Sequence, residues 1–172
     1  MSNKFDWVNG YVRRDPGVIP DTYTANYTLK DLMRKGYVPV EEGQALLDEA
    51  GLVDFAWKIH WPEDFETPDE YLADRVRDVQ GYTIFVHGWT GNHTIWEDLP
   101  GMVVRENRRL VAFSVDHNGF GFSKFTDETP ALNACNPPAA MRTIQKWIDL
   151  MRLRRQPGDT THKVINFVGH SM

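Results

Sequence analysis

The residues best placed to do chemistry stand at the end of the sequence. Gly169, His170, Ser171 and Met172 follow an apolar run of strand length, Lys163 to Val168. A serine two residues after a glycine, where a buried strand ends, is typical of a sharp strand-to-helix turn that thrusts the hydroxyl clear of the backbone. The spacing predicts Ser171 as a nucleophile and Gly169 as the small residue that such a crowded turn needs. The alternative is a serine that caps an ordinary helix.

A second segment, His87-Gly88-Trp89, supplies what acyl transfer needs next. Fixed N–H donors must receive the negative oxygen of a tetrahedral intermediate. We expect those donors to be the backbone N–H groups of Trp89 and Met172. Gly88 would let its turn approach closely, and His87 would hold that turn by a hydrogen bond rather than act as a base. A plain turn with a packed histidine is the alternative.

Ser171 and the segment His87-Gly88-Trp89 each follow an apolar run of strand length, and the sequence has three such runs. They are Tyr82 to Val86, Leu110 to Val115 and Lys163 to Val168, and intervening segments of helical pattern separate them. This alternation predicts parallel strands joined by crossover helices, with the strands buried on both faces. Chemistry in open α/β sheets gathers at the carboxyl ends of the strands. We therefore expect His87-Gly88-Trp89, Asp116-His117-Asn118-Gly119 and His170-Ser171-Met172 to meet at one edge.

The helices between these strands have sequence signals of their own. Thr94 and Glu97 have the spacing of a capping box. Asn136, followed by Pro137 and Pro138, predicts the start of a second helix, and Pro157-Gly158 its end. One face of that second helix is apolar at spacings of three and four: Met141, Ile144, Ile148 and Met151.

Residues 1–80 give a coarser prediction. Thr28 to Gly36 and Val40 to Gly51 are expected to be short helices that end at glycines. Phe55 to Trp61 is expected to be a strand, and Pro62 to Glu70 an acidic loop. We expect residues 1–80 to form amino-terminal helices and first strands, and residues 81–172 to form strand-helix repeats, within one domain.

Three segments, taken in order, resemble the α/β-hydrolase superfamily, in particular its serine lipase and esterase branch. They are Phe85 to Asn92, Val115 to Ser123 and Asn166 to Met172. The resemblance covers about half the chain. It implies an α/β-hydrolase fold, a mostly parallel sheet with helices on both faces, incomplete here after the nucleophile strand. It also implies hydrolysis of carboxylic esters through an acyl-enzyme, with no cofactor, on a small-molecule or lipid ester. The family's acid and histidine base follow the serine in the chain.

Upstream residues are poor substitutes for that acid and base. Asp116 and His117 are adjacent on an extended segment, so their side chains diverge and do not easily form an acid-base pair. The same divergence points His170 away from the partner of the Ser171 hydroxyl. A non-catalytic protein that binds a ligand or partner on the same scaffold remains the alternative function. An ester hydrolase is the prediction.

Composition limits the other classes. The 172 residues are 41% hydrophobic and 12% aromatic, which predicts a folded domain. The 24 acidic and 19 basic residues give a net charge of −5 without a basic block, so no nucleic-acid partner is expected. No signal peptide or transmembrane segment is expected, and Cys135 stands alone, which favours the cytoplasm. The histidines show no metal-ligand spacing, so no metal is expected.

The motif around Ser171 lacks only a final glycine, and this leads to an expectation about the whole protein. We expect the chain to be the front part of a longer hydrolase or one piece of a nicked one, and to turn over esters poorly alone. The strand that ends at Val168 would then be a bare apolar edge. A carboxy-terminal half, or self-association through this edge, is the partner we expect.

Overall fold

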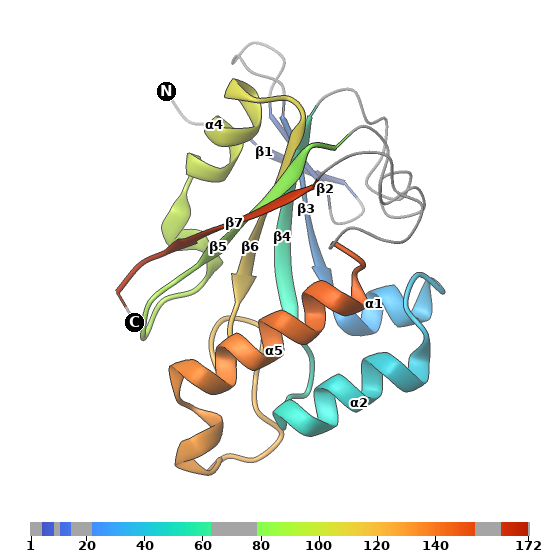
Figure 1. Ribbon diagram of the computed structural model, residues 1–172, viewed down its shortest axis with the longest axis vertical. Helices are drawn as coiled ribbons and strands as arrows, with labels where there is room; N and C mark the ends of the chain where they lie inside the picture. The colour runs from blue at the N-terminus through green and yellow to red at the C-terminus, as the bar shows by residue number, and fades with distance from the viewer. Residues whose placement is uncertain (1–4, 9–10, 15–21, 63–78, 154–162, 172) are drawn as a thin grey trace.

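The computed structural model describes residues 5–8, 11–14, 22–62, 79–153 and 163–171. A seven-stranded sheet within them has the order β1-β2-β3-β4-β6-β5-β7 (Figure 1). Three strands pair in parallel, as their apolar runs predicted: β5 (Gly81–Val86), β6 (Leu110–Asp116) and β7 (Val164–Gly169). The chain is therefore an α/β protein.

The expectation of a mostly parallel sheet is wrong, because the sheet is mixed. The pairs β1-β2, β2-β3, β3-β4 and β4-β6 are antiparallel. Only two residues separate β1 from β2, which is enough for a hairpin and too short for the crossover that parallel pairing requires. The antiparallel strands are β1 (Phe5–Val8), β2 (Tyr11–Arg14), β3 (Thr22–Thr28) and β4 (Ala56–Pro62).

The two short helices predicted before residue 52 are confirmed as α1 (Leu29–Arg34) and α2 (Val40–Ala50). Thr28 and Asp31 form a capping box at the start of α1, each accepting a backbone hydrogen bond from the other. Gly51 follows α2 with φ 67°, the left-handed conformation that glycine adopts without strain. The loop expected from Pro62 to Glu70 lies, apart from Pro62, outside the described residues.

The helix before β7 also begins as predicted. In α5 (Pro137–Leu150), the Asn136 side chain accepts a hydrogen bond from the Ala139 N–H at 2.9 Å. The apolar face is confirmed, since Ile144, Ile148 and Met151 are buried and Met141 packs against the core. The helix ends earlier than expected, because Leu150 is its last residue and Pro157-Gly158 lies outside the described residues.

The helix between β5 and β6 begins later than the sequence predicted. Asn92 caps a short 3-10 helix, η1 (His93–Trp96), and α4 (Leu99–Glu106) follows. The capping box expected at Thr94 does not form, because the Thr94 hydroxyl donates to Asn92 Oδ1 at 2.6 Å. Glu97 has φ 46° and lies between the two helices rather than inside one. A further 3-10 helix, η2 (Leu132–Ala134), precedes α5.

Helices cover both faces of the sheet (Figure 1). On one face, Trp147 of α5 packs against Trp57 and Phe113, with ring centroids 5.2 Å apart in each pair. Helices α1 and α2 contribute to the same core. On the other face, Val104 of α4 packs with Phe85 and Ala112.

Strand β7 is the exposed apolar edge that was expected. All of β5 is buried, whereas Val164 and Phe167 of β7 are 48% and 44% exposed. An edge strand is paired on one side only, so its other side keeps free backbone hydrogen-bonding groups.

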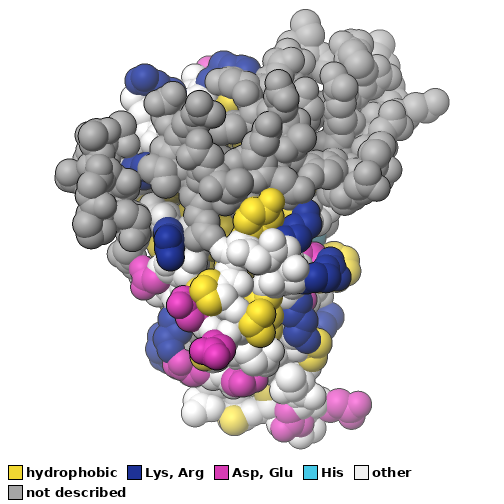
Figure 2. Space-filling model, turned by 90° about the vertical axis from the view of Figure 1, so that its right-hand side faces the viewer, with side chains coloured by type: hydrophobic (Ala, Val, Ile, Leu, Met, Phe, Trp, Pro, Cys, Tyr) yellow, Lys and Arg dark blue, Asp and Glu magenta, His cyan; other side chains and the backbone are white. Residues whose placement is uncertain are grey.

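The surface away from this edge mixes charges. The face turned toward the viewer in Figure 2 carries acidic and basic side chains interspersed with apolar ones among the described residues. No described helix is long and apolar enough to cross a bilayer.

Candidate functional site

The carboxyl ends of the three parallel strands meet at one edge of the sheet, as predicted. Val86, the last residue of β5, is in register with Val115 of β6 and Gly169 of β7. The residues that follow each strand therefore start from the same level of the sheet. The structure thus brings together the three segments selected from the sequence.

Ser171 lies exposed on the turn after β7, and its backbone is strained. Its φ of 37° falls in the left-handed region, which costs a residue with a side chain about 1–3 kcal/mol. Such a turn after a parallel strand is where a nucleophilic serine is expected. The crowding expected at Gly169 is not found, since a Cβ there would have no described atom within 4 Å. Met172 lies outside the described residues.

The turn after β5 packs against the turn after β7 through backbone atoms. The His170 N–H donates to the Val86 carbonyl at 3.1 Å, and the Trp89 N–H donates to the Ser171 carbonyl at 3.2 Å. A Cβ on Gly88 would overlap the carbonyl oxygens of His170 and Ser171. Only glycine therefore permits this approach. The Trp89 N–H is already engaged in this arrangement, so it becomes an oxyanion donor only if the bond to Ser171 opens.

His87 holds its own turn and is not placed as a free base. Its Nδ1 lies 2.8 Å from the Gly88 carbonyl, while its Nε2 lies 3.4 Å from the His117 backbone nitrogen. The ring therefore donates at Nδ1 and presents an acceptor at Nε2. Burial lowers the pKa of His87, although the hydrogen bond to Gly88 and the charge of Asp116 oppose this change. A neutral His87 follows at neutral pH.

His117 stacks on His87 and is also neutral. The two ring centroids are 4.1 Å apart, and the Phe120 ring contacts both. Burial lowers the pKa of His117 to about 4. Phe120 also lies against Trp89, with ring centroids 5.1 Å apart. These aromatic contacts link the turns after β5 and β6.

Asp116 is the buried charge of the site, and it binds His93 instead of orienting His117. Its carboxylate accepts the His93 N–H at 2.7 Å, lies 2.9 Å from His93 Nδ1, and accepts the Phe122 N–H at 2.9 Å. Burial raises the pKa of Asp116, but the hydrogen bonds from His93 and Phe122 outweigh it and leave the pKa below its usual value. The Asp116 carboxylate thus joins the segment after β5, which contains His93, to the segment after β6, which contains Phe122.

The sequence did not single out His93, Phe120 or Phe122. His93 is 23 residues away from Asp116, and no spacing rule joins them. A weak signal existed: a carboxylate buried at a strand end needs donors, and His93 is a nearby polar residue in the preceding connection.

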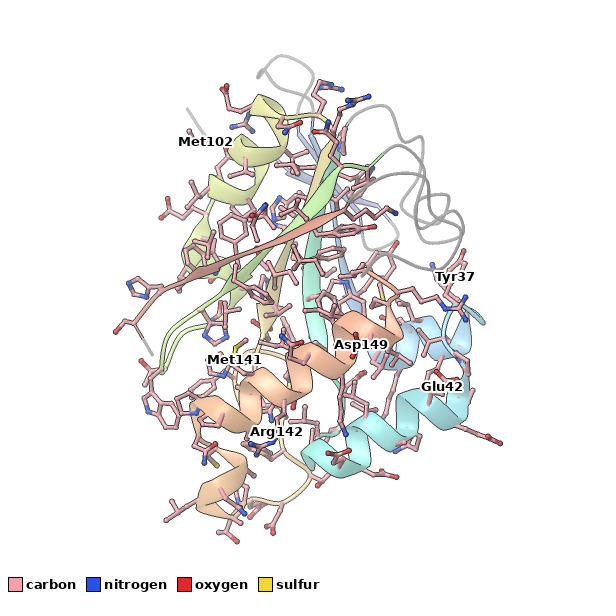
Figure 3. The ribbon with its side chains drawn as sticks, in the orientation of Figure 1. Tyr37, Glu42, Met102, Met141, Arg142 and Asp149 are labelled. Carbon is pink, nitrogen blue, oxygen red and sulfur yellow. The ribbon has the colours of Figure 1, made fainter. Side chains whose placement is uncertain are left out.

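Two cavities adjoin the site. One of about 10 Å³ lies beside Trp89, His117 and Asn118. One of about 150 Å³ lies between α2, α5 and the segment before α5, and Arg142 and Asn133 are among its lining residues. Figure 3 shows Met141 on the side of α5 that faces the sheet and Arg142 on the opposite side.

The site combines the exposed Ser171 with the closely packed backbone of Gly88 and Trp89. The nearby His87 and His117 are neutral. Among the described residues, no histidine or carboxylate hydrogen-bonds the Ser171 hydroxyl. The described residues also include no group of three or more metal-ligating side chains placed to hold an ion. A scan against protein-family models found no match, and a search of curated proteins found no relative.

Proposed function

We propose that this protein has an α/β-hydrolase fold and is a lipase- or esterase-like serine hydrolase of carboxylic esters, with Ser171 as its nucleophile. The observation that carries the proposal is the left-handed backbone of Ser171 on an exposed turn after a parallel strand. Strained residues with a side chain cluster at functional sites, where the surrounding structure holds them. The close backbone packing of Gly88 and Trp89 against this turn supports the same conclusion.

The reaction would follow the acyl-enzyme route. The Ser171 oxygen attacks the ester carbonyl carbon as a base takes its proton, and the carbonyl oxygen becomes an oxyanion. Collapse of this intermediate breaks the bond to the alcohol, which leaves with the proton. Water then attacks the acyl group, releases the acid and restores the serine. The N–H groups of Trp89 and Met172 are the proposed oxyanion donors.

The base and its orienting acid belong, by the family resemblance, to residues later than Ser171. A carboxy-terminal half that packs on β7 is the proposed partner, because β7 is an edge strand of the sheet that the described residues form and has exposed apolar side chains. Self-association through the same edge is the competing use. The proposed substrate is a small-molecule or lipid ester.

A non-catalytic binding protein on the same scaffold is the second candidate. The observation that favours it is the Trp89 N–H, which is bound to the Ser171 carbonyl rather than free to receive an oxyanion. In a binding protein this bond is permanent, whereas in a hydrolase it must open before the reaction.

A fluorophosphonate probe separates the two candidates. The protein purified from its source is treated with the probe, and the modified peptide is identified by mass spectrometry. We expect covalent labelling of Ser171 and none after Ser171→Ala. No labelling of folded protein, under conditions that label a known serine hydrolase in the same tube, would refute the nucleophile. Rapid hydrolysis of a p-nitrophenyl ester by the 172-residue chain alone would refute the need for a downstream base.

A further inference from the structure

A small cavity lies beside Trp89, next to the turn that touches Ser171. Its volume of about 10 Å³ is roughly the room that one water-sized group needs. Two of its lining residues are exposed, Trp89 at 56% and Pro137. Apart from Trp89, the lining residues come from the end of β6 and the start of α5: His117, Asn118, Cys135, Asn136, Pro137 and Ala140.

Two buried polar atoms belong to residues that line this cavity. His117 Nε2 and Asn118 Oδ1 have no hydrogen-bond partner among the described residues, and each residue is 3% exposed. An unsatisfied buried acceptor costs about 1–3 kcal/mol, so such atoms are normally paired. Both residues line this small cavity, and Asn118 also lines the larger one. A small group in this space that reaches both atoms would satisfy them.

The chemistry of the two atoms defines the group. The His117 ring hydrogen-bonds to the backbone of Gly88 and His87. Since Nε2 is the unpartnered nitrogen, the bound proton is at Nδ1 and Nε2 is an acceptor. Asn118 Oδ1 is also an acceptor. Two acceptors around one small space call for a group with two hydrogens to donate, which a ligand –NH₂ has in common with water.

We propose that this cavity is a subsite for a neutral –NH₂ group, such as a carboxamide or a neutral amine, borne by the ligand. A neutral group suits it because the walls at Trp89, Pro137 and Ala140 would not solvate a charge. The substrate class is then an ester that also carries an –NH₂ group. This last step rests on the proposed function, because it is Trp89 that connects the subsite with Ser171.

Formamide and N,N-dimethylformamide are matched probes for the subsite, since only formamide has hydrogens on nitrogen to donate. Each is titrated into the ¹⁵N-labelled 172-residue chain, and the Asn118 side-chain amide and the Trp89 indole are observed by NMR. We expect saturable shifts with formamide alone. Equal shifts with both compounds, or no shift with either, would overturn the subsite.

Variants locate the binding. His117→Phe is expected to weaken formamide binding at least tenfold, because His117 lines only the small cavity. Asn118→Leu is expected to do the same, although Asn118 lines both cavities. Asn133→Leu is the matched control, because Asn133 is exposed and lines only the larger cavity. Loss of binding in the Asn133 variant, with His117→Phe unaffected, would assign the ligand to the larger cavity and overturn the proposal.

The link to the substrate is tested separately. Formamide is added during fluorophosphonate labelling of the protein from its source, and slower labelling of Ser171 is expected with formamide than with dimethylformamide. If NMR shows binding but formamide leaves the labelling rate unchanged, the subsite stands and the substrate class falls. If Ser171 is never labelled, the proposed function fails while the NMR result still decides the subsite.

Discussion

Residues at the strand ends are fixed by contacts that few other residue types could make. Gly88 lies against the carbonyl oxygens of His170 and Ser171. The Asp116 carboxylate contacts two nitrogens of His93 and the backbone nitrogen of Phe122. The rings of His87 and His117 are stacked. Each of these contacts predicts the effect of one substitution.

Gly88→Ala is expected to lower the free energy of unfolding by about 1–3 kcal/mol, the usual cost of overpacking. The new methyl group must displace the carbonyl oxygens of His170 and Ser171. Urea denaturation followed by tryptophan fluorescence measures the change. Gly169→Ala is the control, because a Cβ there meets no described atom within 4 Å, and a change under about 0.5 kcal/mol is expected. Similar losses in both variants would contradict the close packing at Gly88.

His117 is expected to make stability depend on pH between about 6.5 and 4. Burial lowers the pKa of His117 from 6.5 to about 4, so the unfolded chain binds the proton more readily. Stability is therefore full above pH 6.5 and falls as the pH drops toward 4, by about 3 kcal/mol in all. His117→Phe should remove most of this loss in urea titrations at several pH values. His87, whose pKa burial also lowers, leaves a remainder. An unchanged slope in the variant would refute the assignment.

Asp116 is expected to act in a lower pH range. Its pKa lies below the usual value, so its stabilisation is full above pH 4 and is lost as the pH falls through the folded-state pKa. Asp116→Asn should cost about 2–3 kcal/mol at pH 7, as for lost hydrogen bonds to a charge, and less at pH 3. Urea unfolding at both pH values measures this. The exposed Asp127→Asn is the control, and an equal loss in both variants at pH 7 would contradict the role of the buried carboxylate.

Local sequence signals were enough for some of these residues and not for others. Ser171, Gly88 and His87 were selected because glycine spacing next to a strand end is a local pattern. The partnership of His93 with Asp116 depends on how a whole connection folds, so no short pattern reports it. The engagement of the Trp89 N–H depends on the relative position of two turns, which the sequence does not encode locally.

The elements show the same division. The start and the buried face of α5 were predicted closely, because Asn136 and two prolines mark the start and a regular apolar pattern marks the face, whereas the end was placed too late. The start of α4 was mispredicted because Asn92 competes for the groups that would form the capping box at Thr94. The antiparallel half of the sheet was missed because the pairing of edge strands is set by partners distant in sequence.

Strand β7 is the element whose exposure has the clearest consequence in solution. Phe167→Lys should reduce concentration-dependent association of the 172-residue chain, because a charge on an edge strand opposes pairing with another edge. Sedimentation velocity over a range of concentrations measures the change. Asn166→Lys, at the neighbouring exposed and already polar position, should have a smaller effect. A wild-type chain that is monomeric at every concentration would show that this edge does not associate.

At the scale of the molecule, the larger of two core clusters among the described residues joins the two halves of the chain. Leu29, Leu47 and Trp57 belong to the same cluster of buried residues as Phe113 and Trp147. A shared core of this kind favours a single cooperative unfolding transition.

Leu47→Ala tests this at the scale of the molecule. We expect it to lower the free energy of unfolding by about 2–5 kcal/mol and to shift far-UV and near-UV circular dichroism transitions together. Val40→Ala in the same helix is the control, because Val40 is 62% exposed and its loss should matter little. Separate transitions for the two signals would show that residues 81–172 fold independently of the first part.

The left-handed backbone at Ser171 creates a conflict between stability, which favours glycine there, and the proposed reaction, which needs serine. Glycine, and to a lesser degree asparagine, adopts this conformation at lower cost. A library of all substitutions at residue 171, selected only for soluble protein, should therefore favour residues other than the natural one. Selection for ester cleavage should favour serine alone. If serine is retained at a position where the backbone conformation favours glycine, the protein has lost some stability in order to keep its nucleophile.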